Sequence, residues 1–262
     1  MGSVRSPGAG AAGARDAPAA GAAPLLAIEA LSKRYGALKV TDALSLEVRR
    51  GEALGIIGPN GAGKTTLMNL ISGDVAPDAG RIVFEGRDIT ALPAAARCHA
   101  GIARSYQIPH PFTGLSVYEN VLVGATFGAR RSEPAARARA LQVLARTGLA
   151  AKVNRAAASL PLLDRKRLEL ARALATEPTL LLLDEIAGGL TEHEVHELVA
   201  TIQSIRDEGV TIVWIEHIVH ALLAVVGRLV ALDFGRLLVD GEPAAVMADP
   251  AVREIYMGID VE

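Results

Sequence analysis

The residues Gly58-Pro59-Asn60-Gly61-Ala62-Gly63-Lys64-Thr65-Thr66 match G-x-x-x-x-G-K-[ST], the pattern of a phosphate-binding P-loop. The short apolar run before this stretch, residues 53–57, is typical of a buried strand. The residues after it, 67–71, are typical of a helix that Gly73 ends. A strand, a glycine-rich loop and a helix in this order are the context that the motif requires. The stretch therefore predicts a phosphate-binding loop at the start of a helix.

Each part of this loop has a chemical role. Glycines lack a Cβ, so the backbone can wrap closely around a phosphate chain and turn its N–H groups inward. The helix N-terminus adds partial positive charge. We expect Lys64 to bridge the β- and γ-phosphates and Thr65 to hold Mg²⁺. One alternative is a glycine-rich turn that binds nothing. A dinucleotide fingerprint is the other, although its G-x-G-x-x-G spacing differs.

The composition limits the classes of function. The chain has 262 residues, half of them hydrophobic, which is enough for one large domain or two small ones. Its formal net charge of −2 gives no basic footprint for nucleic acid. Cys98 is the only cysteine, so no internal disulfide can form, which fits a reducing compartment. The most apolar stretch, residues 221–232, contains Arg228 and is too short to span a membrane.

The order of elements follows from the apolar patterns. Residues 1–24 are mostly Ala, Gly and Pro and are expected to form a disordered tail. A polar turn is expected at residues 32–36 and a mostly helical stretch at residues 89–176. One helix there starts near Ser132, and Arg137, Arg139 and Arg146 are expected on its solvated face. Apolar runs predict strands at residues 25–31, 44–48, 53–57, 81–85, 180–183, 210–215 and 229–240, the last as a hairpin.

Polar residues that follow two of the buried strands are candidates for catalysis. Asp184 and Glu185 end a run of four leucines, where open α/β sheets bind ligands. Adjacent strand residues point in opposite directions, so we expect Asp184 to be the Mg²⁺ partner and Glu185 to activate the attacking water. His217 follows another buried strand and could reach a γ-phosphate oxygen. The alternatives are acids that merely end a strand and a histidine with a structural role.

Taken in order, these motifs resemble the ATP-binding subunits of ABC transporters over residues 25–262. The resemblance implies an α/β fold: a P-loop NTPase (RecA-like) core with an antiparallel β subdomain and an inserted helical subdomain at about residues 89–176. It also implies the cofactors ATP and Mg²⁺. Tyr35 resembles the aromatic residue that stacks on adenine, although it could instead pack against the sheet.

The remaining family motifs give further candidate residues. The stretch from Gly58 to Thr66 resembles Walker A, and residues 180–185 resemble Walker B with its catalytic glutamate. Gln107 resembles the Q-loop glutamine, which implies a catalytic role and a Mg²⁺ ligand. Residues 188–191 resemble the D-loop, and His217 resembles the switch histidine.

Three segments narrow the resemblance to the ATPases of branched-chain amino acid importers: residues 112–121, 214–217 and 249–258. This implies transport of a branched-chain amino acid or a related small polar solute. The implied partners are a second ABC ATPase subunit, identical or not, transmembrane permease subunits and, indirectly, a solute-binding protein, with no nucleic acid. The implied location is peripheral, on the cytoplasmic face of the inner membrane.

One motif departs from the family. The signature Leu-Ser-Gly-Gly-Gln is replaced by Leu160-Pro161-Leu162-Leu163-Asp164, although the basic helix after it matches. Pro161 has no N–H and the two leucines add bulk, so we expect a weakened contribution to the partner's site, with this chain's own Walker site intact. Asp164 could cap the helix, and Ile186 replaces the usual proline. The variant signature could alternatively work through backbone groups alone.

Two other functions remain open at this point. One is an ABC ATPase that acts on nucleic acid or ribosomes, against which the absence of basic arms and of a second cassette argues. The other is a regulatory nucleotide-binding subunit with low turnover, which the stretch from Leu160 to Asp164 suggests.

Overall fold

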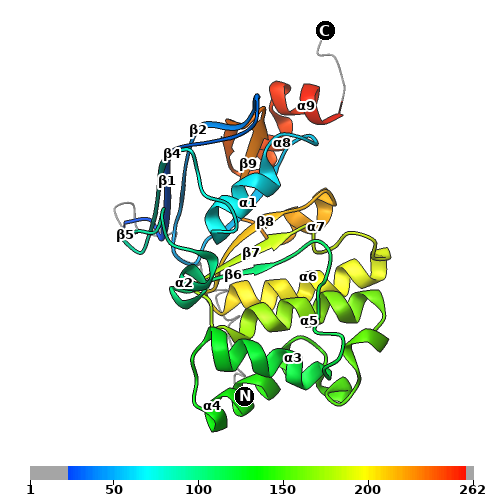
Figure 1. Cartoon of the computed structure of the whole chain (residues 1–262). Coiled ribbons are helices and arrows are strands. Elements are labelled where there is room, and N and C mark those ends of the chain that lie inside the picture. The colour runs from blue at the N-terminus through cyan, green and yellow to red at the C-terminus, as the bar shows by residue number, and fades with distance from the viewer. Residues whose placement is uncertain (1–22, 258–262) are drawn as a thin grey trace, which may run out of the picture.

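The computed structural model describes residues 23–257 as an α/β fold of two sheets and surrounding helices (Figure 1). Most of the expected disordered tail, residues 1–22, lies outside the described residues, as does Gly258 at the end of the C-terminal motif. None of the helices in residues 23–257 is both long and apolar enough to cross a membrane.

The strands form one antiparallel and one largely parallel sheet. They are β1 Leu26–Tyr35, β2 Leu38–Val48, β3 Ala53–Ile57, β4 Ala79–Phe84, β5 Arg87–Asp88, β6 Ile102–Ser105, β7 Leu180–Asp184, β8 Thr211–Ile215, β9 Arg228–Asp233 and β10 Arg236–Gly241. The helices are α1 Lys64–Ser72, α2 Ala94–His99, α3 Val117–Val123, α4 Glu133–Arg146, α5 Leu162–Ala175, α6 Glu192–Asp207, α7 Val219–Leu223, α8 Pro243–Ala248 and α9 Pro250–Met257. A π-helical turn, η1 Gly124–Gly128, and two 3₁₀ turns, η2 Ala150–Lys152 and η3 Ala157–Ser159, complete the set.

The antiparallel sheet has the order β2-β1-β4-β5. Its first strand corrects the expected polar turn at residues 32–36, because β1 continues to Tyr35 and pairs there with Leu38 of β2. The polar residues remain in the strand because their backbone has partners in neighbouring segments. Arg34 pairs with Lys39 of β2, and the Arg34 N–H donates to Asp78 Oδ2, just before β4, at 2.7 Å. The true turn is short and uses Gly36 at φ +60°, a conformation that glycine adopts without strain.

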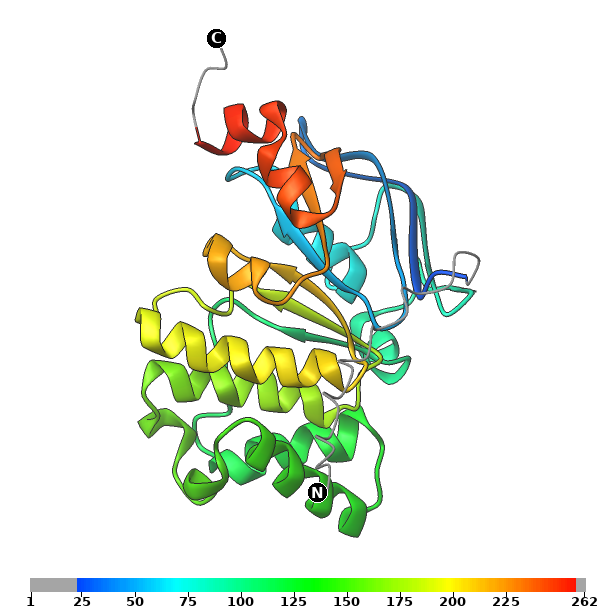
Figure 2. The same ribbon diagram turned by 180° about the vertical axis from the view of Figure 1, so that it is seen from behind.

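The second sheet has the order β10-β9-β3-β8-β7-β6, and its strands are parallel except for β10. Its core strands β3, β7 and β8 are mostly apolar because both faces are covered. In β7, Leu180 and Leu182 join a core with α1 and the antiparallel sheet, whereas Leu181 and Leu183 join the core that includes α5 and α6. Figure 2 shows α5 and α6 running side by side beneath this sheet.

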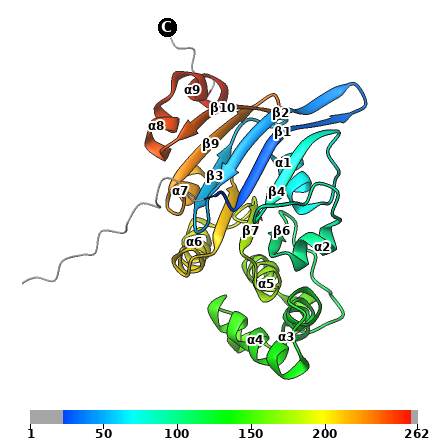
Figure 3. The same ribbon diagram turned by 90° about the vertical axis from the view of Figure 1, so that its left-hand side faces the viewer.

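The helices α3 and α4 form a helical part that lies beyond α5, at the far end from the C-terminal helices α8 and α9 (Figure 3). One strand, β6, falls within the mostly helical stretch 89–176 and pairs with β7 at the sheet edge. The prediction that Arg137, Arg139 and Arg146 lie on a solvated face of α4 is only partly correct. Arg137 is exposed, but Arg139 donates to Leu174 O at 2.9 Å and Arg146 pairs with Glu208 at 2.7 Å, each with less than a fifth of its side chain exposed. Acceptors on neighbouring elements thus draw both arginines inward.

The two-sided burial of β7 predicts how stability responds to truncation. Leu182→Ala removes a fully buried side chain and should lower the free energy of unfolding by about 2–5 kcal/mol. Leu141→Ala on α4, where the residue is 52 % exposed, should change it by less than about 0.5 kcal/mol. Urea unfolding followed by circular dichroism measures both. Equal losses for the two variants would contradict the assignment of β7 to the centre of the core.

Candidate functional site

The glycine-rich loop connects β3 to α1 and touches both sheets. Gly58 has φ +152°, and a Cβ there would lie 2.3 Å from the carbonyl oxygen of Leu232 in β9. Gly63 has φ +98°, and a Cβ there would lie 2.4 Å from the carbonyl oxygen of Val40 in β2. Real Cβ atoms do not approach oxygen so closely, so only glycine fits at either position. The loop is therefore clamped between the two sheets.

Lys64 opens α1 and lies at the floor of a cleft. Its Nζ donates to Gly58 O at 2.7 Å and to Pro59 O at 3.0 Å, and only 6 % of the residue is exposed. Burial lowers the pKa of the Lys64 ammonium, while the charges of Glu185 and Asp184 act against that change. The cleft is lined by Val40, Asn60, Gly61, Ala62, Gly63, Lys64, Thr65, Thr66 and Glu185. A buried cation at a helix N-terminus fits a polyphosphate.

Three of the expected catalytic residues meet beside this cleft. Gln107 Nε2 donates to Glu185 Oε2 at 2.5 Å, and His217 Nε2 lies 2.8 Å from Glu185 Oε1. Glu185 has φ +46°, an unusual value for a residue with a Cβ, and its N–H donates to Ile215 O at 2.8 Å. The three residues come from different segments: one follows β6, one follows β7 and one follows β8. The carboxyl ends of neighbouring parallel strands thus bring the trio together.

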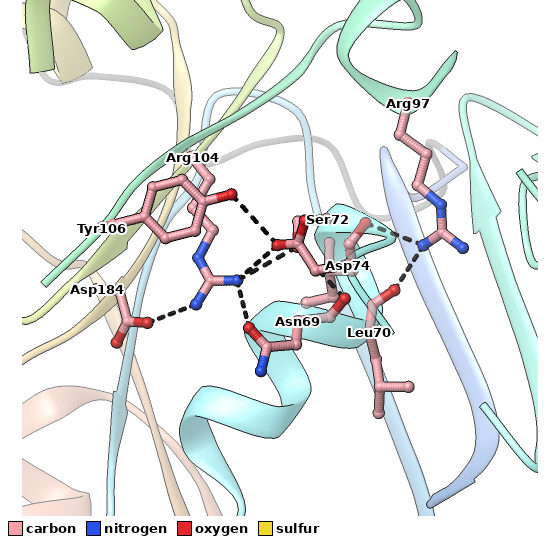
Figure 4. Close-up of polar contacts among 9 residues, drawn as sticks. Asn69, Leu70, Ser72, Asp74, Arg97, Arg104, Tyr106 and Asp184 are labelled. Carbon is pink, nitrogen blue, oxygen red and sulfur yellow. Dashed lines mark hydrogen bonds and ion pairs between the residues drawn. The ribbon is translucent and has the colours of Figure 1, made fainter. Parts of the chain in front are cut away.

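A buried arginine that the sequence analysis did not identify holds Asp184 (Figure 4). The Arg104 guanidinium donates to Asp184 Oδ2 at 2.6 Å, to Asn69 Oδ1 at 2.5 Å and to Asp74 Oδ2 at 3.1 Å. It also lies 4.7 Å from the centre of the Tyr106 ring. The side chains of Arg104 and Asp184 are 5 % and 4 % exposed. Arg104 on β6 therefore ties the end of β7 to the C-terminal turn of α1.

The donor set fits a Mg²⁺ ion that is completed by phosphate and water. Thr65 is exposed in the first turn of α1. Asp184 is the last residue of β7, which only β8 separates from β3 in the sheet. Among residues 23–257, no cluster of three or more His, Cys, Asp or Glu side chains is suited to hold a metal by itself. Mg²⁺ is usually bound through one or two protein ligands plus substrate phosphates and waters, so these residues are compatible with it.

Two predicted parts of the site do not line the cleft at the glycine-rich loop. Tyr35 ends β1, is 48 % exposed and does not line the cleft at the glycine-rich loop. The variant signature forms the start of α5, with Pro161 as its N-cap residue and Leu162 39 % exposed. Asp164 does not cap this helix, contrary to the expectation. It is 2 % exposed and pairs with Lys152 at 2.5 Å, because α5 already begins at Leu162 and Asp164 lies within its first turn.

Sequence reasoning also missed Lys166 and Glu216, which are 3 % and 1 % exposed. A signal was present for both. Lys166 lies three residues after Leu163 and four before Leu170, so it belongs to the buried face of α5. Glu216 directly follows a strand whose residues are all buried. Charged residues on a buried face are rare unless they are paired or hydrogen-bonded.

The sequence matches a known protein family. The profile of the family described as ABC transporter matches residues 41–188. The high-affinity branched-chain amino acid transport ATP-binding protein LivG of Salmonella typhimurium is 35 % identical over 250 residues, which is 90 % of this chain and 98 % of that protein. The lipopolysaccharide export system ATP-binding protein LptB of Acidithiobacillus ferridurans is 37 % identical over 235 residues, covering 89 % and 97 %.

Solved structures of the same kind superpose on the chain. A nucleotide-free ATP-binding cassette from an ABC transporter has a TM-score of 0.82 at 30 % identity and covers 90 % of this chain and all of that one. The ADP conformation of such a cassette has a TM-score of 0.81 at 31 % identity, covering 91 % of this chain and all of that one. These neighbours confirm the predicted α/β fold with its antiparallel sheet and helical part.

The buried ion pair at Arg104 predicts a stability effect. Arg104→Met leaves the buried Asp184 carboxylate without its partner and should lower the free energy of unfolding by about 3–5 kcal/mol. Arg81→Met, which removes an exposed pair with Glu29, is the matched control and should leave the unfolding midpoint nearly unchanged. Thermal unfolding by calorimetry gives both values. A loss at Arg104 no larger than that at Arg81 would contradict the role assigned to the guanidinium.

Proposed function

Because the chain belongs to the ABC transporter family of ATP-binding ATPases, we propose that it energises the import of a branched-chain amino acid or a related small polar solute. The observation that carries this proposal is the meeting of Gln107, Glu185 and His217 beside a cradle built for phosphate. The relatives named for branched-chain amino acid transport support the choice of solute.

In the proposed site the loop from Gly58 to Thr66 holds the phosphates and Tyr35 stacks on the adenine. Lys64 leaves the carbonyl oxygens of Gly58 and Pro59 and bridges the β- and γ-phosphates. Thr65, Asp184 and Gln107 would hold Mg²⁺, which would supply positive charge against the negative charge of the phosphates.

We propose Glu185 as the base that orients and deprotonates the attacking water. Its carboxylate is held from two sides by Gln107 Nε2 and His217 Nε2, so its position depends on both segments. Gln107 must leave Oε2 before that oxygen can accept a proton from water. His217 then donates toward the γ-phosphate and stabilises its growing negative charge.

The variant signature supports a dimer of two non-identical cassettes. In ABC dimers each nucleotide lies between one glycine-rich loop and the opposite signature. Here Pro161 offers no N–H and the exposed Leu162 side chain lies beside Gly189 of the D-loop, where a glycine would leave room for phosphate. We propose that this chain binds ATP in a competent site that a partner's ordinary signature completes, while it completes the partner's site poorly.

A second surface fits the proposed permease. A cleft next to the nucleotide site is lined by residues of α2, β6, η1 and α5, among them Arg104, Tyr106, Glu169 and Arg172. Arg172 donates to His110 O at 2.8 Å and lies 4.7 Å from the centre of the Phe112 ring, which fixes the segment after Gln107 along this cleft. Ile108 in the same segment is 65 % exposed. We propose that the permease contacts residues 108–120 here, on the cytoplasmic face of the membrane.

The direction of transport is tested by reconstitution. The chain, its gene-neighbour permeases and the second cassette are placed in proteoliposomes with the binding protein outside. ATP-dependent uptake of leucine, or of an amide or urea, is the expected result. Because one relative serves lipopolysaccharide export, extraction of lipopolysaccharide from the same vesicles without solute uptake would overturn the importer proposal. Neither activity, with steady hydrolysis, would favour a non-transport ATPase.

Substitution of the proposed base gives a direct kinetic test. Glu185→Gln keeps the size of the side chain but removes the base, so kcat for ATP hydrolysis should fall by roughly 10²–10⁴-fold while MgATP affinity is retained. Glu192→Gln on the exposed start of α6 is the matched control and should hydrolyse ATP normally. Phosphate release and binding of a fluorescent ATP analogue are the measurements. Unchanged hydrolysis by Glu185→Gln would refute the assignment.

Repair of the signature tests the unequal dimer. Pro161→Ser combined with Leu162→Gly restores a hydroxyl and space at two exposed positions. Hydrolysis by the assembled transporter should rise by about tenfold, because one donor to developing charge is worth roughly 10²–10³-fold in kcat. Leu162→Ala alone is the control and should change little. A fall in hydrolysis would show that the native stretch already works through its backbone.

A further inference from the structure

We propose that Lys166 and Glu216 are positioning residues for ATP hydrolysis. Their side chains hold the backbone segments that carry Gln107, Glu185 and His217. The inference rests on the proposed function, because it concerns the geometry of the proposed catalytic trio. Both lie in stretches that resemble the family, Glu216 within residues 214–217 and Lys166 in the basic helix after the variant signature, but neither has been given a role above. Both are almost fully buried charged groups, at 3 % and 1 % exposure, and they lie on different elements.

Lys166 holds two of the three residues. Its Nζ, on the first turns of α5, donates to Gln107 O at 2.7 Å and to Glu185 O at 3.4 Å. These carbonyls belong to the same two residues whose side chains meet at Glu185 Oε2. One ammonium therefore fixes the separation of their backbones, and with it the reach of the Gln107 amide to the carboxylate.

Glu216 holds the third residue and the segment after Glu185. Its Oε1 accepts from His217 N at 2.9 Å and from Ile218 N at 3.4 Å, and its Oε2 accepts from Ala187 N at 3.0 Å. One carboxylate thus links the chain two residues after the base to the chain that carries His217. A carboxylate that accepts several backbone N–H groups makes a strong, directional anchor.

The charges of the two residues support one another. Burial lowers the pKa of the Lys166 ammonium, and the negative charges of Glu216 and Glu185 counteract that change. An isolated buried cation or anion would carry a large desolvation penalty. The opposite charge nearby offsets part of this penalty for each group. The arrangement also joins the helical part to the catalytic end of the parallel sheet, since Lys166 lies on α5 and Glu216 follows β8.

Kinetics of the full-length chain test the proposal. Lys166→Met should lower kcat for ATP hydrolysis by roughly 10–100-fold, since small misplacements of catalytic groups have effects of that size. Its MgATP affinity should stay within about threefold of the wild type, and Lys166→Arg should recover most of kcat. Lys166→Met with wild-type kcat, or with kcat and affinity lost in proportion, would overturn the proposal.

A buried arginine elsewhere provides the control. Arg97 is 1 % exposed and donates to the carbonyl oxygens of Leu70, Ile71, Thr90 and Leu92, none of which belongs to the trio. Arg97→Met should lower the unfolding midpoint as Lys166→Met does, yet leave kcat within about threefold of the wild type. If kcat falls equally in both variants, Lys166 has only a structural role and the proposal is wrong.

Hydrogen exchange gives a readout that needs no turnover. Glu216→Gln replaces one of the two acceptor oxygens by an NH2 group, so either the amide of Ala187 or those of His217 and Ile218 should exchange about tenfold faster, while amides in α1 keep their protection. Unchanged exchange at all three amides would overturn the role of Glu216. A wild-type chain that neither binds nor hydrolyses MgATP would instead overturn the proposed function, and the exchange result would still decide the positioning role.

Discussion

The structure depends on a close approach that only glycine allows. Gly58 lies against the backbone of β9, and Gly63 and Gly235 lie against the carbonyl oxygen of Val40 in β2. A Cβ at any of these positions would come within 2.4 Å of an oxygen. The loop therefore touches both the parallel and the antiparallel sheet, and α1 runs from it into the core between them. The shape of the proposed phosphate cradle and the packing of the two sheets both depend on this constraint.

Around this cradle, buried charged side chains fix the relative positions of elements in a way that hydrophobic packing does not. Apolar contacts stabilise without direction, whereas Arg104, Lys166 and Glu216 each make several hydrogen bonds with defined geometry. Each connects strand ends or helices that are distant in the sequence. The carboxyl end of the parallel strands is thus held by a polar layer, and the remainder of the fold is held by two apolar cores.

Contiguous motifs made much of this predictable. The residues of the glycine-rich loop are contiguous in the sequence, and so are the two carboxylates at the end of β7. Their spacing alone therefore indicates the local secondary structure and the phosphate chemistry that such residues could perform. Arg104 could not be recognised in that way, because its partners Asn69, Asp74 and Asp184 come from other elements. Asp164 was misread for the same reason: its partner Lys152 lies 12 residues earlier, on a separate turn. Residues 32–35 look like a turn by polarity, but strand pairing decides their conformation.

The backbone of Glu185 sets a limit on how this cassette can change. Its φ of +46° places a side chain with a Cβ in a region that glycine and asparagine occupy more easily. The carboxylate is thus retained against a local conformational preference, a pattern found where activity and stability oppose each other. With Glu185 as the proposed base, a lineage that no longer needed turnover would be expected to drift toward small residues at this position and to become more stable as it lost hydrolysis.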